Sequence, residues 1–452
     1  MAEKREQLAS RMGFILLTAG CAIGLGNVWR VPYVTGQHGG GLFVLFYLLF
    51  LLIMGFPVLV MELAVGRAGR STYPGAFAKL QNPDCRFRWR PMGYVLFSGN
   101  LILLMFYTAV TGWLLAYAGA YLAGRGGALE AEDFSRLLAS PGRQTCYMLL
   151  ALAITVAVCM GGVRQTIEKS IKFMMAGLFL LLAALVVNAL RLPGAEEGVA
   201  FFLQPDPAGL AQAGLGKTIH AAMTQAFFTL SIGIGALAVC GSYFGRDRSL
   251  PLEGLWIILL DTLVAIAAGL IIFPSCQAFG IAPDAGPSLI FITLPRVFQN
   301  LPGGGFWGAL FFIFLSVAAL STLIAVFENL TAFGMDEFHW SRKRSCAVFG
   351  VALTALSIPC ILGFNLWRNF HPLGKGSNIL DLEDFIVSNN LLPLGAFYLT
   401  VFCMHRCGWG AENALAEINA GEGWRFPRWP LFYLKWILPL IILLIWVLEI
   451  FP

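Results

Sequence analysis

Two glycine-containing segments carry residue types that could bind an ion and a carboxylate together. Ile23-Gly24-Leu25-Gly26 and Ile232-Gly233-Ile234-Gly235 each lie near the middle of a long apolar stretch. Glycine is about 1 kcal/mol less favourable than alanine in a helix, so paired glycines favour local unwinding. Because lipid cannot satisfy freed backbone groups, an unwound segment is tolerated only where it lines a cavity or binds a ligand. Freed N–H groups can bind a carboxylate, and freed carbonyls can bind a cation. The alternative interpretation is that these glycines only allow neighbouring helices to pack closely.

The composition places these segments in a membrane protein. Of 452 residues, 58% are apolar and 12% are charged, whereas a soluble chain carries roughly 25% charged residues. So few charges cannot cover a water-soluble particle of this size. This excludes a soluble enzyme, a disordered scaffold and a nucleic-acid binder, despite the net charge of +5. Apolar runs of roughly 20 residues indicate spanning helices rather than barrel strands of roughly 10.

The apolar runs predict an all-α polytopic membrane protein with eleven transmembrane helices. The first run continues through Trp29 and Arg30, so it is interpreted as a retained helix rather than a signal peptide. If the N-terminus is cytoplasmic, most of the 30 Lys and Arg residues lie on the cytoplasmic side, as the positive-inside rule requires. Eleven spans then place the C-terminus on the extracytoplasmic side. The predicted spans lie near residues 10–35, 41–66, 92–122, 144–161, 166–190, 216–242, 252–276, 303–335, 345–365, 379–404 and 431–451.

The positions of the two glycine segments predict an internal repeat. The segments occupy the first and sixth spans, so each set of five helices begins with a discontinuous one. Because five is odd, the second set crosses the membrane in the opposite sense to the first, which is typical of transporters with inverted repeats. We expect a first repeat at 1–190, a second at 191–405, and a connection with the last helix at 406–452.

Longer motifs around these segments resemble a known family. The chain contains Gly20-Cys21-Ala22-Ile23-Gly24-Leu25-Gly26-Asn27-Val28-Trp29-Arg30-Val31-Pro32-Tyr33, then Gly39-Gly40-Gly41, Gly55-Phe56-Pro57, Glu62 and Gly66-Arg67, and later Phe227-Phe228-Thr229-Leu230-Ser231-Ile232-Gly233-Ile234-Gly235-Ala236. These motifs resemble the neurotransmitter:sodium symporters, especially bacterial amino-acid members of the leucine-transporter type. The geometry expected at the membrane midplane is taken from such a member.

This resemblance covers nearly the whole chain and implies a sodium-coupled, alternating-access carrier in the bacterial inner membrane. It implies an amino acid as substrate, the lipid bilayer as surroundings, no nucleic-acid partner, and a monomer or a weak homodimer. The sequence shows no nucleophile with a base, metal cluster or phosphate loop, so an enzyme is not expected.

Two sodium sites follow from the resemblance. Sodium is a hard cation that needs several oxygen ligands. One site would use the Ala22 carbonyl, the side chains of Asn27, Thr229 and Asp261, and the substrate carboxylate. The second would use the carbonyls of Gly20, Ile23 and Ala318 with the hydroxyls of Ser321 and Thr322. By themselves, these two hydroxyls are typical of ordinary hydrogen bonds between helices.

The resemblance also assigns a substrate pocket and two gates. Gly24 stands where monoamine members of the family carry a carboxylate. Because glycine has no side chain, the site has room for a substrate that carries a carboxylate of its own. The outer gate would pair Arg30 with Asp384, and the inner gate would pair Arg5 with Asp336 near Tyr243. The pocket side chains are uncharged, which favours hydrophobic branched or aromatic L-amino acids. The substrate-binding residues would be Ala22, Gly24, Leu25, Gly26, Leu103, Tyr107, Phe228, Thr229, Ser231, Ile234 and Val326.

Asp261 departs from the leucine-transporting relatives, which carry an amide there. A carboxylate within a span marks an ion or proton pathway by default. Chloride-dependent relatives bind the anion at positions matched here by Tyr47, Gln225 and Thr229, and we expect Asp261 to supply that charge, so that transport is chloride-independent. The alternative for Asp261 is a place beside a water-filled vestibule, without contact to an ion. The alternatives for the function are a carrier coupled to protons through Asp261, a carrier for a methylated osmolyte or γ-amino acid, and a transporter-like sensor or channel.

The fifth span also departs from the family pattern. Relatives carry a glycine and, ten residues later, a proline that let the helix unwind beside the second sodium site. Thr166 and Ala176 occupy these positions here. We expect sodium to leave by a different water path or more slowly.

Overall fold

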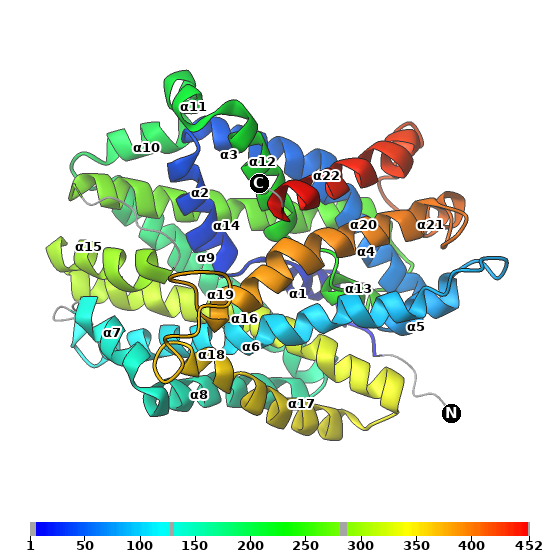
Figure 1. Ribbon diagram of the computed structural model, residues 1–452, viewed down its shortest axis with the longest axis horizontal. Coiled ribbons are helices and arrows are strands. Elements are labelled where there is room, and N and C mark those ends of the chain that lie inside the picture. The colour runs from blue at the N-terminus through cyan, green and yellow to red at the C-terminus, as the bar shows by residue number, and fades with distance from the viewer. Residues whose placement is uncertain (1–5, 127–130, 281–286, 451–452) are drawn as a thin grey trace.

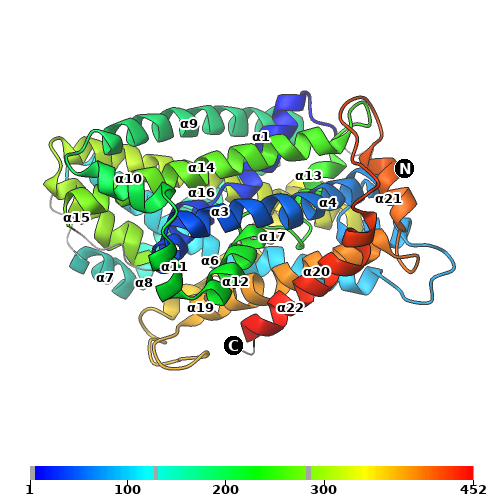
Figure 2. The same ribbon diagram turned by 90° about the horizontal axis from the view of Figure 1, so that it is seen from above.

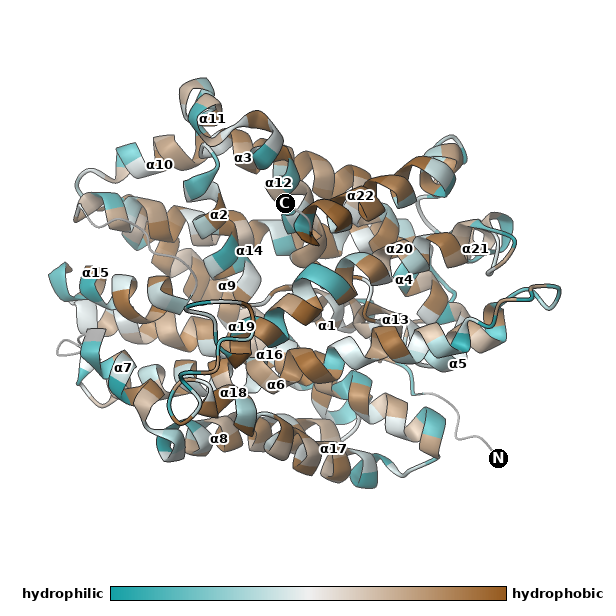
Figure 3. Cartoon of the chain, viewed as in Figure 1, coloured by the Kyte–Doolittle hydropathy of each residue, from teal (hydrophilic) through white to brown (hydrophobic). Residues whose placement is uncertain are grey.

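The fold is a bundle of long helices, as expected from the apolar runs. The structure is a computed structural model that describes residues 6–126, 131–280 and 287–450, and within these ranges the regular elements are all helical. Nine helices in the described ranges are long and apolar enough to cross a membrane. Figure 3 shows hydrophobic residues along the long helices and hydrophilic residues mainly at their ends and in the connections.

The long helices match the predicted spans to within a few residues. Several comprise more than one labelled helix joined by a π-helical turn or a bend: α3 with α4, α17 with α18, and α19 with α20. Their bounds are Gly41–Gly69 (α3, Gly41–Phe50; α4, Phe56–Gly69), Arg90–Leu122 (α6), Pro141–Met160 (α8), Val163–Leu190 (with α9, Glu168–Leu190), Leu250–Ala278 (α14), Gly304–Phe338 (α16), Arg342–Leu362 (α17, Arg342–Leu356; α18, Ile358–Leu362), Ile379–Met404 (α19, Ile379–Asp384; α20, Leu392–Met404) and Tyr433–Ile450 (with α22, Leu438–Ile450).

The first predicted span is broken near its middle. Helix α1 (Arg11–Ala22) ends where Ile23 adopts an extended backbone, and the chain resumes as a π-helical turn (Gly26–Arg30) that leads into α2 (Val31–Gln37). The two parts meet at an angle of 56°. This break lies at the predicted Ile-Gly-Leu-Gly segment.

The sixth predicted span is broken as well. Helix α12 (Leu215–Phe228) and helix α13 (Ala236–Ser242) are separated by residues 229–235. Gly233 and Gly235 have φ angles of 102° and 88°, and Ser231 has a φ of 50°. Glycine adopts such angles without a Cβ clash. The all-helical membrane class is therefore confirmed, while the count of eleven helices stays a prediction because the sixth span consists of two short pieces.

Short helices cover the two ends of the bundle. They are α5 (Tyr73–Leu80), α7 (Ala131–Ala139), α10 (Ala195–Leu203), α11 (Pro207–Ala213), α15 (Leu294–Asn300) and α21 (Ala411–Ile418). Figures 1 and 2 show α7, α10 and α15 at one end and α21 at the other, and Figure 1 shows α5 near α21. The end with α21 is called the N-terminal end below.

Helices at corresponding places in the two predicted halves pack against each other. Helix α1 contacts α13, α4 contacts α14, α6 contacts α16, and α8 contacts α17. An inverted repeat would produce this pairing, because equivalent helices then meet across a shared axis. The division at 1–190, 191–405 and 406–452 stays a prediction.

Candidate ion and substrate site

The first helix break presents backbone groups to the interior of the bundle. The Gly24 N–H donates to Asn27 Oδ1 at 3.2 Å, so a side chain replaces the missing helical bond. The Leu25 N–H donates to the Tyr107 hydroxyl at 3.3 Å. Tyr107 therefore lies where the resemblance places the substrate carboxylate.

A buried carboxylate joins the two breaks. Asp261 in α14 accepts a hydrogen bond from Asn27 Nδ2 at 2.8 Å and one from Thr229 Oγ1 at 3.0 Å. Asn27 Nδ2 also lies 3.2 Å from Thr229 Oγ1, and all three side chains are buried. The structure thus brings together Asn27, Thr229 and Asp261, three predicted ligands of one sodium site. The oxygens of Asp261 and Thr229 have the hard, partly anionic character that a sodium ion requires, whereas Asn27 directs its amide nitrogen at them and its oxygen at the Gly24 N–H.

The predicted ligands of the second sodium site also converge. The Thr322 hydroxyl, on α16, donates to the carbonyls of Gly20 at 3.0 Å and Ile23 at 2.9 Å. The Ser321 hydroxyl donates to the Ala318 carbonyl at 2.8 Å. The carbonyls of Gly20 and Ile23 and the Thr322 hydroxyl fit a cation, because they gather at the end of α1 where the break leaves carbonyls without helical partners.

Glu62 holds the second break in place. This carboxylate, fully buried in α4, accepts hydrogen bonds from the N–H groups of Gly233 at 2.7 Å and Gly235 at 3.0 Å. Unwinding frees these donors at a depth where lipid offers no acceptor. The sequence named Glu62 only as part of a motif, although an acid within an apolar span was a usable signal.

A cavity of about 520 Å³ lies between the two breaks and extends to α19. Val326 is fully buried and does not line this cavity. Phe106 and Val110 line it but were missed, although they follow Leu103 at the three- and seven-residue spacing of one helix face. The predicted substrate residues that line it are Ala22, Gly24, Leu25, Gly26, Leu103, Tyr107, Phe228, Thr229, Ser231 and Ile234.

The predicted outer gate lines the same cavity. The Arg30 guanidinium lies 4.0 Å from the centre of the Phe228 ring. Asp384 accepts a hydrogen bond from Ser388 Oγ at 2.6 Å. Both charged residues line the cavity, and in the described part of the chain they form no ion pair with each other within 4.0 Å. The predicted pair therefore borders the cavity with its charges apart.

The N-terminal end of the bundle is tied by polar contacts. Asp336 accepts hydrogen bonds from the Thr72 N–H at 2.7 Å and the Ser71 hydroxyl at 3.1 Å. Its predicted partner Arg5 lies outside the described residues. Tyr243, predicted to lie nearby, donates its hydroxyl to Glu328 Oε1 at 2.6 Å.

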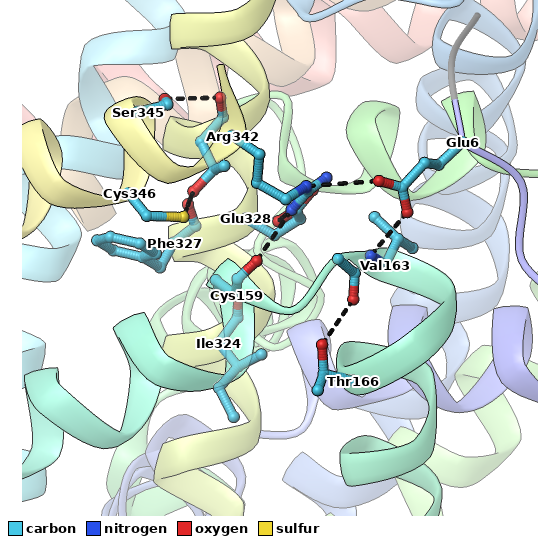
Figure 4. Close-up of polar contacts among 12 residues, drawn as sticks. Glu6, Cys159, Val163, Thr166, Ile324, Phe327, Glu328, Arg342, Ser345 and Cys346 are labelled. Carbon is cyan, nitrogen blue, oxygen red and sulfur yellow. Dashed lines mark hydrogen bonds and ion pairs between the residues drawn. The ribbon is translucent and has the colours of Figure 1, made fainter. Parts of the chain in front are cut away.

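A second charged network at this end was not predicted. Arg342 binds Glu328 through two hydrogen bonds of 2.7 and 2.9 Å, and its Nε lies 3.5 Å from Glu6 Oε1. The second oxygen of Glu6 accepts from the Val163 N–H at 2.8 Å. Figure 4 shows Arg342 between the two acids. Glu328 and Arg342 lie fourteen residues apart on successive helices, a distance that local sequence patterns do not connect.

Comparison with known proteins agrees with this geometry. The model of the sodium:neurotransmitter symporter family matches residues 5–124 and 128–451. An uncharacterized sodium-dependent transporter of Bacillus subtilis (strain 168), YhdH, is 34% identical, with 98% of this chain and 97% of that protein covered. The sodium- and chloride-dependent GABA transporter 2 of Bos taurus is 25% identical over 96% of this chain and 78% of its own.

A solved structure extends the likeness to three dimensions. The crystal structure of MhsT in complex with L-phenylalanine matches with a TM-score of 0.86 and 38% identity, covering 98% of this chain and 99% of that one. Family members are transporters, so the prediction that the chain is not an enzyme is confirmed. The chain belongs to the sodium:neurotransmitter symporter family and is a sodium-dependent multi-pass membrane transporter.

Proposed function

We propose that this transporter imports hydrophobic L-amino acids together with two sodium ions, without chloride, by alternating access. The observation that carries the proposal is the meeting of the two helix breaks across one cavity, with Asp261 bonded to a residue from each break. The Tyr107 hydroxyl and the Leu25 N–H suit a substrate carboxylate. A substrate that also bonds a sodium ion couples the two affinities reciprocally.

The side chains around the breaks support a hydrophobic substrate. Leu103, Phe106, Val110, Phe228 and Ile234 line the cavity and carry no charge. The structural neighbour MhsT was solved with L-phenylalanine, which suits a cavity of this kind. An apolar pocket discriminates by about 1 to 3 kcal/mol per methylene, so we expect several branched and aromatic amino acids to compete.

The contacts at the two ends support alternating access. The cavity reaches Arg30 and Asp384, whose charges lie apart, while Glu328, Arg342 and Glu6 tie the opposite end. We propose that Arg30 and Asp384 face the outside, that the N-terminal end is cytoplasmic, and that the protein lies in the bacterial inner membrane. Two charges moving through 100 mV supply roughly 4.6 kcal/mol, which can drive roughly a thousandfold accumulation.

Uptake into proteoliposomes tests the function. Radiolabelled leucine or tryptophan should accumulate only with an inward sodium gradient, and equally in chloride and gluconate media. Unlabelled γ-aminobutyrate and betaine should not compete. Binding without accumulation would indicate a sensor, sodium current without substrate a channel, and uptake driven by a proton gradient alone a proton-coupled carrier. A steep loss in gluconate would refute chloride independence.

Replacing Thr322 with valine should weaken sodium binding at the second proposed site. Valine keeps the shape but removes the hydroxyl that faces the carbonyls of Gly20 and Ile23. A hydrogen-bonding group that meets a charge contributes about 1.5 to 3 kcal/mol, so the half-saturating sodium concentration should rise about tenfold or more. Sodium titration of leucine binding measures it. The control is Thr155→Val in α8, where the hydroxyl bonds the carbonyl four residues earlier; an equal shift in both variants would contradict the assignment.

A further inference from the structure

The main chain at Ile234, within the second break, is held from several sides. Its neighbours Gly233 and Gly235 donate their N–H groups to Glu62, and its carbonyl accepts from Asn100 Nδ2 at 2.6 Å. On the far side Gly233 lies against α20: a Cβ placed on Gly395 would fall 2.2 Å from the Gly233 carbonyl oxygen. The backbone of Ile234 therefore has little room to shift.

The side chain of Ile234 lies between the cavity and α6. It lines the cavity on one face. On the other face it meets Gly99: a Cβ placed on Gly99 would fall 2.7 Å from Ile234 Cγ2 and 3.4 Å from Leu391 Cδ1. Real Cβ atoms essentially never approach another atom as closely as 2.7 Å. Gly99 thus provides the space into which the Ile234 side chain fits.

Two successive residues of α6 consequently position one residue of the pocket. Asn100, which is fully buried, binds the Ile234 carbonyl, and Gly99 accommodates its side chain. Neither Gly99 nor Asn100 lines the cavity. We call this pair the Ile234 seat. Because the backbone of Ile234 has little room to shift, we expect a Cβ added at Gly99 to displace the Ile234 side chain, and the cavity is the open space beside that side chain.

We propose that the Ile234 seat sets the size of side chain that the substrate pocket accepts. The proposal rests on the function proposed above, because it concerns selectivity among hydrophobic amino acids. Gly99 and Asn100 act through Ile234 and are positioning residues. A pocket narrowed by one methyl group should exclude tryptophan, the largest side chain, much more strongly than valine.

The test compares two glycine-to-alanine substitutions in the same helix. Gly99→Ala should lower the affinity for L-tryptophan relative to L-valine by about tenfold or more, as expected for one methylene in an apolar pocket. Gly119→Ala is the matched control, because a Cβ at that position meets no atom within 4 Å. Competition of both amino acids against radiolabelled leucine, in sodium-loaded detergent-purified protein, measures the ratio. The control should keep the wild-type ratio.

A second substitution isolates the contact with Ile234. Ile234→Ala removes the Cγ2 atom, so adding Gly99→Ala in that background should change the tryptophan-to-valine ratio by less than about twofold. If Gly99→Ala alone does not fold, the double variant should fold, since the clash is gone. A Gly99→Ala effect of the same size in both backgrounds, or loss of folding in both, would overturn the proposal.

The outcomes separate this inference from the proposed function. If the wild-type protein accumulates neither leucine nor tryptophan with sodium, the proposed transport function is overturned. The proposed role of the Ile234 seat in amino-acid selectivity is then overturned as well. Wild-type protein that accumulates both, with a Gly99→Ala variant that lowers all affinities equally, would overturn the seat alone. A selective loss of tryptophan in Gly99→Ala, absent from Gly119→Ala, would support it.

Discussion

Replacing Asp261 with asparagine should make transport depend on chloride. The carboxylate lies between Asn27 and Thr229, where sodium is proposed to bind. A unit charge 4 Å from a cation contributes about 4 kcal/mol at an effective dielectric of 20, close to a thousandfold in sodium affinity. Uptake by the variant should therefore fall to near background in gluconate.

Chloride should restore part of this activity. Tyr47 donates its hydroxyl to Thr229 at 3.4 Å, and the buried amide of Gln225 has no hydrogen-bond partner among the described residues. These groups can donate to an anion once the fixed charge is gone. The control is Asp206→Asn, at the exposed start of α11, which should behave as wild type. Equal uptake by Asp261→Asn in both media would show that its charge does not replace chloride.

Replacing Glu62 with alanine should destabilise the protein and abolish transport. The change leaves the N–H groups of Gly233 and Gly235 without their acceptor in a buried region. Each unsatisfied buried donor costs about 1 to 3 kcal/mol, so the expected loss is about 2 to 6 kcal/mol. Thermal unfolding in detergent and sodium-driven leucine uptake measure the two effects.

The exposed acid Glu412 provides the control for Glu62. Its ion pair with Arg428 lies at the surface, with both side chains more than 70% exposed. Surface pairs contribute about 0 to 1 kcal/mol, so Glu412→Ala should leave the unfolding temperature nearly unchanged. A Glu62→Ala variant as stable as Glu412→Ala would mean that the second break does not depend on this carboxylate.

The sequence determined the positions of the long helices and of both breaks because the signals are local. Apolar length defines a span, and paired glycines within it define where it opens, as at Gly24 and Gly233. Asn27, Thr229 and Asp261 were predicted as sodium ligands from the family resemblance, and the structure brings these side chains together. Within one helix, the three- and seven-residue spacing from Leu103 also contained Phe106 and Val110, which went unused.

Other features depended on contacts between distant segments. Nothing near Ile234 in the sequence points to Gly99, and nothing near Glu328 points to Glu6, because helix packing creates both relationships.

The fifth span shows a limit of the family pattern. Thr166 replaces the expected glycine, yet a π-helical turn forms at Val163–Ile167, directly after Gly161 and Gly162. Local widening of this helix thus spans the position that the family pattern indicated, although that position holds threonine and the glycines precede it.

In the alternating-access cycle proposed above, the Thr322 hydroxyl also bears on the step in which the transporter returns without sodium or substrate. A hydroxyl both donates and accepts, so one rotation about its C–O bond turns the lone pairs toward an ion or the proton toward the carbonyls of Gly20 and Ile23. If sodium binds there as proposed, the same two carbonyls keep a hydrogen-bond donor after the ion leaves, as they do in the structure. A side chain able only to accept would leave both buried carbonyls without a donor once the ion is gone, at a cost of about 1 to 3 kcal/mol for each unsatisfied group.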